Sequence, residues 1–103
     1  MKLPEDPFIL ELLPEFIDTW INDIKDQLDT IISSKDSDEL YRFGHTIKGS
    51  CLQFGIEEIA LLGIEMMGYA KAKDFDNAQV LGDKILQSFI EANEFVASKL
   101  KNN

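Results

Sequence analysis

Apolar side chains recur every three or four residues over most of this chain, a spacing that places them on one face of a helix. In the first third of the chain these positions are Leu13, Phe16, Ile17, Trp20, Ile21, Ile24, Leu28 and Ile31. Charged residues stand between them. Because proline damages the interior of a helix, Pro14 predicts a break, with a short helix over residues 8–12 and a long one over 14–33.

The same spacing predicts three more helices, over residues 39–54, 56–72 and 77–100. The polar stretch 33–38 forms the first turn, with an N-cap at Ser37 or Asp38. Gly55 ends the following helix in the left-handed conformation, and residues 73–76 make a short connection to the last helix. No segment alternates polar and apolar residues as a half-buried strand would, so we expect no sheet.

Each of these three helices carries a stripe of side chains that we expect in the core. In the helix over 39–54 they are Leu40, Phe43, Ile47, Cys51 and Phe54. In the next they are Ile59, Leu62, Met66 and either Tyr69 or Ala70. In the last they are Ala78, Leu81, Ile85, Phe89, Ala92 and Val96. Short connections make neighbouring helices antiparallel. The predicted fold is therefore all-α, an antiparallel up-down four-helix bundle with a short extra N-terminal helix.

Composition and charge narrow the classes of function. With 103 residues, 45% of them hydrophobic, the chain has enough material for one domain with one core, spanning 1–103. Lysine and arginine total 10 against 19 acidic residues, a formal charge of −9, which disfavours binding to nucleic acid or to a membrane surface. An acidic surface can still steer the chain toward a basic protein face. The single cysteine and the polar start of the chain are typical of a cytoplasmic protein, which we expect to be a monomer.

The only histidine of the chain, His45, lies off the apolar stripe of its helix. At about 100° per residue it points roughly 160° away from the middle of that stripe, so we expect its ring in solvent. A solvent-exposed imidazole is a good nucleophile near neutral pH. Lys48, three residues on, lies on the same side of the helix and could hold a positive charge against a phosphoryl group on the ring.

Two glycines, Gly44 and Gly49, lie beside His45 in the middle of the same helix. Each costs about 1 kcal/mol relative to alanine, so some benefit should offset the cost. We expect both to give a bulky partner steric access to the imidazole. Tyr41 and Leu52 would be apolar groups on the outer face, as expected of a surface that docks a partner.

The sequence His45-Thr-Ile-Lys48-Gly49-Ser50, followed by Gly55, resembles the signature of histidine-containing phosphotransfer (HPt) domains. The resemblance covers most of the chain, including LLPEFIDTW, AKAKDFDNAQ and the final amphipathic helix. It implies that His45 is the phospho-acceptor, that Lys48 stabilises the phosphate, that Gly49 opens space beside the ring and that Gly55 marks the turn after the active helix.

The same resemblance implies the partners of the chain. They would be response-regulator receiver domains and a hybrid sensor histidine kinase, with the phosphoryl group passing between aspartate and histidine. The chain has no Gly-rich phosphate loop, so we expect a phosphoryl carrier rather than an enzyme, with no cofactor of its own and Mg²⁺ held by the partner receiver domain. A metal site is not expected, because one histidine and one cysteine on different faces make a poor ligand set.

The chain departs from the family pattern at one position. Many members carry a glutamine on the following helix that reaches the active imidazole, and the corresponding residue here is Met67. Methionine cannot replace that hydrogen bond. Gln53, two turns after His45, is a candidate for orienting the ring and for the docking surface, although an ordinary surface glutamine is the simpler interpretation.

Two other functions fit parts of the same pattern. A bundle that binds receiver domains without transferring phosphate, a helical adaptor, would explain Met67. The phospho-accepting module of a chemotaxis-type kinase has a similar motif, but these 103 residues hold no ATP-binding region. The phosphotransfer hypothesis is the leading one, because it is motivated by the outward-facing His45 together with Lys48 and Gly49.

Overall fold

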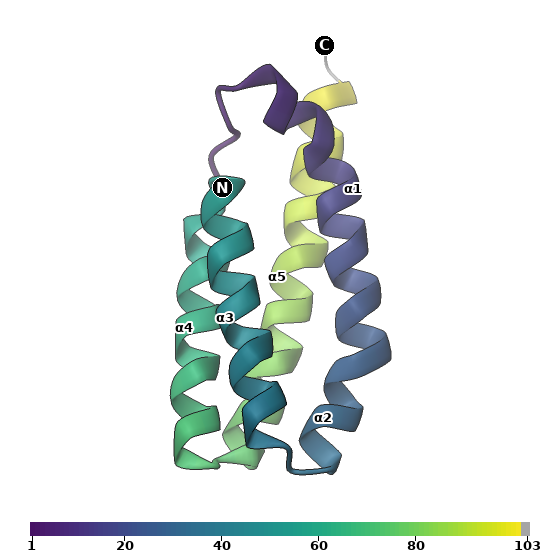
Figure 1. Ribbon diagram of the computed structural model, residues 1–103. Helices are drawn as coiled ribbons and strands as arrows, with labels where there is room; N and C mark the ends of the chain where they lie inside the picture. The colour runs from purple at the N-terminus through teal and green to yellow at the C-terminus, as the bar shows by residue number, and fades with distance from the viewer. Residues whose placement is uncertain (102–103) are drawn as a thin grey trace.

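The computed structural model describes residues 1–101, and side chains for residues 1–100. Its elements in chain order are α1 (Pro7–Asp23), the π-helical turn η1 (Ile24–Leu28), α2 (Asp29–Ser33), α3 (Ser37–Gln53), α4 (Glu57–Ala72) and α5 (Phe75–Lys101). The first three run on as one rod, and the described residues contain no strand. The four resulting rods lie side by side in up-down order (Figure 1). The predicted all-α antiparallel four-helix bundle is confirmed.

The predicted break at Pro14 is wrong, and the short N-terminal helix is instead the beginning of α1. Pro14 lacks one backbone donor, but Leu13 and Ile17 on either side of it are fully buried. Burial of these two side chains offsets the single lost hydrogen bond. The helix starts at Pro7, where a proline is well tolerated, and the Asp6 side chain accepts a hydrogen bond from the Phe8 N–H at 2.9 Å.

The turn η1 changes which residues face the core. A π-helical turn inserts extra backbone into the helical repeat. Beyond it Ile32 is buried, whereas Ile31, which we expected to face inward, is only partly buried. Leu28, at the end of η1, packs against α5 where Gly82 leaves room: a Cβ on Gly82 would lie 2.6 Å from the Leu28 Cδ2.

The turns between helices share one geometry, in which a residue in the left-handed conformation follows the helix end. Gly55 ends α3 with φ +76°, and the Ile56 N–H donates to the Cys51 carbonyl at 2.8 Å, as in a Schellman motif. Lys35 and Lys73 adopt the same conformation after α2 and α4. The prediction for Gly55 is confirmed.

The N-cap of α3 is Asp36, not Ser37 or Asp38 as predicted. Its carboxylate accepts a hydrogen bond from the Glu39 N–H at 3.1 Å. The left-handed Lys35 brings the chain into the helix one residue earlier than the sequence pattern indicated.

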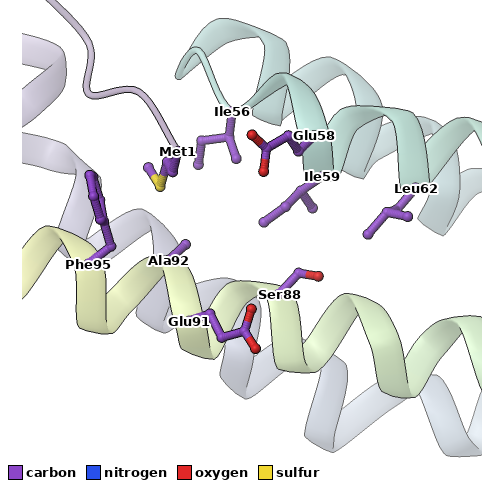
Figure 2. Close-up of a pocket in the computed structure, with 9 residues that line it drawn as sticks. All are labelled: Met1, Ile56, Glu58, Ile59, Leu62, Ser88, Glu91, Ala92 and Phe95. Atoms are coloured by element: carbon purple, nitrogen blue, oxygen red, sulfur yellow. The ribbon is translucent and has the colours of Figure 1, made fainter.

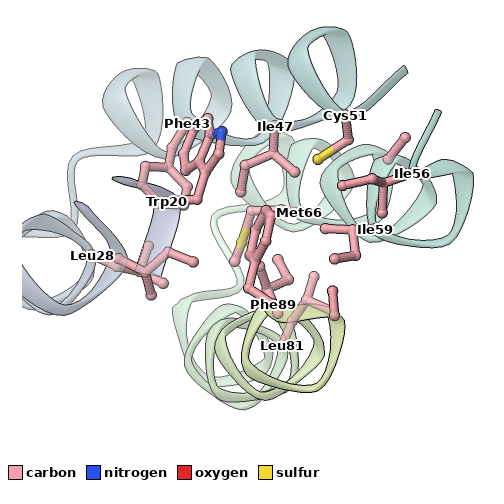
Figure 3. Close-up of a cluster of buried hydrophobic side chains, with 14 of the residues drawn as sticks. Trp20, Leu28, Phe43, Ile47, Cys51, Ile56, Ile59, Met66, Leu81 and Phe89 are labelled. Atoms are coloured by element: carbon pink, nitrogen blue, oxygen red, sulfur yellow. The ribbon is translucent and has the colours of Figure 1, made fainter. Parts of the chain in front are cut away.

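The core contains most of the side chains expected in it, but Phe16, Ile21, Ile31, Phe54 and Leu62 are only partly buried. Its members are Leu13, Ile17, Trp20, Ile24, Leu28, Ile32, Leu40, Phe43, Ile47, Cys51, Ile56, Ile59, Ala60, Met66, Ala70, Ala78, Leu81, Ile85, Phe89, Ala92 and Val96. Trp20 joins three rods, with its ring edge-on to Phe43 at 5.6 Å and stacked on Phe89 at 6.0 Å (Figure 3). Ala70 rather than Tyr69 is the buried member of its pair.

Close contact between α3 and α4 depends on two glycines that face each other. A Cβ on Gly44 would lie 2.7 Å from the Gly63 carbonyl oxygen, and a Cβ on Gly63 would lie 2.7 Å from the Gly44 oxygen. Neither backbone leaves room for a side chain. This crossing brings the outer faces of α3 and α4 together into one surface, which includes His45. None of the helices in the described part of the chain has the length and apolarity that a membrane crossing requires.

Candidate functional site

His45 lies on α3 with its side chain exposed, as the helical pattern predicted. Leu40, Phe43 and Ile47 hold the inner face of the same helix in the core. The imidazole ring stands 6.4 Å, centroid to centroid, from the ring of Tyr41, one turn earlier, and the two planes differ by 21°. A bulky partner can therefore reach the ring nitrogens from solvent.

Three basic residues and one carboxylate, that of Asp38, surround His45. Lys48 lies three residues along α3 and is half-buried. Arg42 also borders the site, since it lines an open hollow with His45, but it pairs with Glu39 at 2.9 Å. The third is Lys71 on α4, whose ammonium lies 5.4 Å from the centre of the Tyr41 ring. Sequence reasoning missed Lys71, because only the packing of α4 on α3 places it here.

The two glycines beside His45 have different surroundings. A Cβ on Gly49 would meet nothing within 4 Å, so this stretch of backbone is open to a partner, as expected. Gly44 is buried against α4, and its missing side chain makes room for Gly63 and Met67. The expectation that Gly44 gives steric access to the imidazole is wrong: its Cβ direction lies at an angle to that of His45 and points into the helix crossing.

Helix α4 contributes an apolar outer face that the helical pattern did not reveal. Leu61 is 65% exposed and Ile64 46% exposed, and Gly68 is exposed with nothing near its Cβ position. By helical spacing these three residues share one side of α4 with Lys71, the side that meets α3. On α3 the corresponding residue is Leu52, 52% exposed. The sequence feature that could have predicted this outer face is the distribution of apolar residues all around the axis of α4, because a helix of that kind is usually covered on more than one side.

No side chain orients the imidazole among residues 1–100, because none of their hydrogen bonds involves His45. Met67 lies against Gly44 at the helix crossing, with its Cγ 3.1 Å from the Gly44 Cβ position, and offers no hydrogen bond. Gln53 is exposed two turns away along α3 and makes no contact that could fix the ring. The idea that Gln53 orients His45 is therefore not supported by the geometry.

Other candidate sites in the chain lack the chemistry of this one. Cys51 is fully buried, and burial raises the pKa of its thiol to about 12, so it is not a nucleophile at neutral pH. A second hollow lies between α4 and α5 and is shown in Figure 2. Glu58 and Glu91 line it among apolar side chains, and no lysine or arginine does. Two carboxylates would repel a phosphoryl group, so this hollow is a poor phosphate site.

The site on the α3–α4 face thus combines an accessible imidazole, uncompensated lysines, open backbone and apolar surroundings. A family model, the Hpt domain, matches residues 11–94 and so covers all of these residues. No curated protein and no solved structure matches the chain. Hpt domains are helical phosphotransfer domains of phosphorelays, carriers rather than catalysts, and they interact with receiver domains. Because the match covers most of its length, the chain belongs to the Hpt domain family.

Proposed function

We propose that this chain is a histidine phosphotransfer protein of a multistep phosphorelay. It accepts a phosphoryl group on His45 from a receiver-domain aspartate or a hybrid sensor kinase and passes it to a response regulator. The observation that carries the proposal is the exposed imidazole beside Lys48 and the open backbone of Gly49, within an Hpt domain.

The transfer step needs one nucleophile from this chain. A neutral imidazole nitrogen attacks the phosphorus of the partner's aspartyl phosphate. A nitrogen–phosphorus bond forms, the oxygen–phosphorus bond breaks, and the carboxylate leaves. The proton on the other ring nitrogen stays or passes to water. Lys48 stabilises the phosphoryl charge from one turn along α3, and the receiver domain supplies Mg²⁺ and the remaining charge stabilisation.

We propose that the α3–α4 face docks the partner. This face comprises Tyr41, His45, Lys48, Gly49, Leu52, Leu61, Ile64, Gly68 and Lys71. It carries three of the six large apolar side chains exposed among the described residues, Leu52, Leu61 and Ile64, and such a patch is typical of a protein interface. Its two lysines place positive charge beside His45 in a chain whose net charge is −9, so the partner's acidic phosphorylation site would meet complementary charge at this face.

The test is a phosphotransfer profile against phosphorylated receiver domains and hybrid kinases of the source organism. We expect label on this chain that is acid-labile and base-stable, as phosphohistidine is. A His45→Gln variant should take up no label while keeping its fold, since the residue is exposed and glutamine suits a helix. Persistent labelling of that variant would overturn the assignment of the acceptor.

One observation favours a second candidate, an adaptor that binds receivers without chemistry. Met67 stands where a ring-orienting glutamine is common in the family, and no described side chain holds the imidazole. Receiver binding without transfer, under conditions in which a known carrier is labelled, would support the adaptor and contradict the carrier.

A further inference from the structure

We infer that Lys71 is a second phosphate-binding residue. When His45 is phosphorylated, the Lys71 ammonium moves from the face of the Tyr41 ring to the phosphoryl group. This inference rests on the proposed function. It adds a residue from α4 to the acceptor and the phosphate-stabilising lysine, which both lie on α3.

The geometry places Lys71 within reach of His45. Its Nζ lies 5.4 Å from the centre of the Tyr41 ring, and that ring lies 6.4 Å from the imidazole. The ammonium and the acceptor ring therefore both neighbour the ring of Tyr41. Lys71 is exposed, and a lysine head group swings over several ångströms by rotation of its methylene chain, so no backbone movement is needed.

Lys71 should bind a phosphoryl group more strongly than it binds the Tyr41 ring, and this difference sets the direction of its movement. In the unphosphorylated protein, Lys71 has only the weak attraction of an aromatic face, because it pairs with no carboxylate among residues 1–100. A phosphoryl group brings nearly two negative charges and three acceptor oxygens. Arg42 is paired with Glu39 and lines the hollow at His45 together with Asp38, so Lys48 and Lys71 are the nearby cations that no carboxylate offsets among residues 1–100.

The chain offers an internal control for this movement. Lys99 lies over the Phe95 ring at 5.5 Å, nearly the same contact as that of Lys71 over Tyr41, but near the end of α5. Aromatic rings displace the resonances of protons above their faces. The ε-methylene protons of both lysines should therefore be shifted in the unphosphorylated protein, and only those of Lys71 should respond to events at His45.

The experiment phosphorylates the whole chain with phosphoramidate, so that no protein partner is needed. The imidazole nitrogen takes the phosphoryl group, and the nitrogen–phosphorus bond of the donor breaks with loss of ammonia. We expect the Lys71 ε-proton resonances to return toward ordinary values on phosphorylation, while those of Lys99 stay unchanged. If a phosphohistidine signal appears in the phosphorus spectrum and Lys71 does not respond, the inference is wrong and the carrier proposal survives.

A second readout uses the titration of the phosphoryl group itself. A nearby cation favours its dianion, so Lys71→Met should raise the midpoint of its phosphorus-shift titration by about half a pH unit. Lys99→Met removes the same charge and the same kind of aromatic contact, and should leave the midpoint unchanged; Lys71→Arg should restore it. Equal midpoints in the two methionine variants would overturn the inference. Failure of the wild type to form phosphohistidine would count against the proposed function itself.

Discussion

At the scale of single residues, the helical glycines near His45 divide into two kinds. Gly44 and Gly63 allow two backbones to meet, and a Cβ on either would lie 2.7 Å from the other's carbonyl oxygen. Gly49 and Gly68 have nothing near their Cβ positions. Packing therefore explains the first pair and not the second. A helix normally loses stability at an exposed glycine, so the open pair is better explained by a partner's need for space.

This difference predicts opposite effects of the same substitution. Gly44→Ala should lower the free energy of unfolding by about 1–3 kcal/mol, because the helices must separate to admit the methyl group. Gly68→Ala should raise it by about 0.5–1 kcal/mol, because alanine is the better helix former. Urea unfolding followed by fluorescence of Trp20, the single tryptophan and a core residue, measures both. Equal effects of the two substitutions would contradict the assignment of Gly44 to packing.

The buried thiol of Cys51 gives a prediction on pH. Burial raises its pKa from 9.0 to about 12. Between these two pH values the unfolded state loses the thiol proton while the folded state keeps it. Its contribution to stability is complete below pH 9 and is lost as the pH rises from 9 toward 12. We expect the urea midpoint of the wild type to fall over this range more steeply than that of Cys51→Ala.

Reactivity of the same thiol is the complementary measurement. At pH 8 iodoacetamide should modify Cys51 slowly in the folded protein and rapidly in urea, since the thiolate is the reactive form. Rapid modification without urea would show that the core around α3 opens readily, and would argue against an inert thiol.

At the scale of helices and turns, two left-handed lysines are a local strain that the structure tolerates. Lys35 and Lys73 both have φ +54°, a conformation that costs a residue with a Cβ about 1–2 kcal/mol. Glycine would remove that strain but would also make the unfolded chain more flexible. We expect Lys73→Gly to raise the free energy of unfolding by about 0.5 kcal/mol.

A matched substitution tests whether the turn conformation is responsible. Lys84 is exposed inside α5, so Lys84→Gly removes the same charge from a helical position. It should lower the free energy of unfolding by about 0.5–1 kcal/mol. If both variants are destabilised, the strain at Lys73 does not govern the effect.

The order of the helices could be predicted from the sequence, because each apolar stripe is long and its connections are short. Two local features could not. A proline at position 14 is compatible with a broken helix and with a continuous helix that packing stabilises. Only the burial of Leu13 and Ile17 decides between the two. The turn η1 has no mark in the sequence, although its last residue, Leu28, packs where Gly82 leaves room on α5.

Only the part of the candidate site that lies on α3 could be predicted from the sequence. His45, Lys48 and Gly49 lie within five residues on one helix, so helical spacing fixed their relation before any tertiary contact was known. Lys71 joins them only through the register of α4 on α3. Gly44 was assigned to the wrong role for the same reason, because its neighbour across the crossing, Gly63, is distant in sequence.

At the scale of the whole molecule, the bundle presents its functional groups on one long face. The molecule measures 45 Å by 19 Å by 16 Å, so two neighbouring helices already make up much of one side. The α3–α4 face carries His45, two lysines and exposed Leu52, Leu61 and Ile64. By contrast, Val80, which is 68% exposed, lies on α5 rather than on α3 or α4. The arrangement favours a partner that covers both helices at once.

This arrangement predicts that α4 matters for transfer although it holds no acceptor. Leu61→Glu keeps a residue that suits a helix but puts a charge into the apolar part of the face. If Leu61 is buried by the partner, losing about 1.4 kcal/mol of docking free energy lowers the affinity tenfold, and more for a central contact. Val80→Glu adds the same charge to a side chain at least as exposed, outside the α3–α4 face. We expect receiver binding and phosphotransfer at low receiver concentration to fall at least tenfold in the first variant and to stay unchanged in the second, with phosphoramidate labelling normal in both. Similar losses in both variants would point to net charge as the cause, and no loss in either would confine docking to α3.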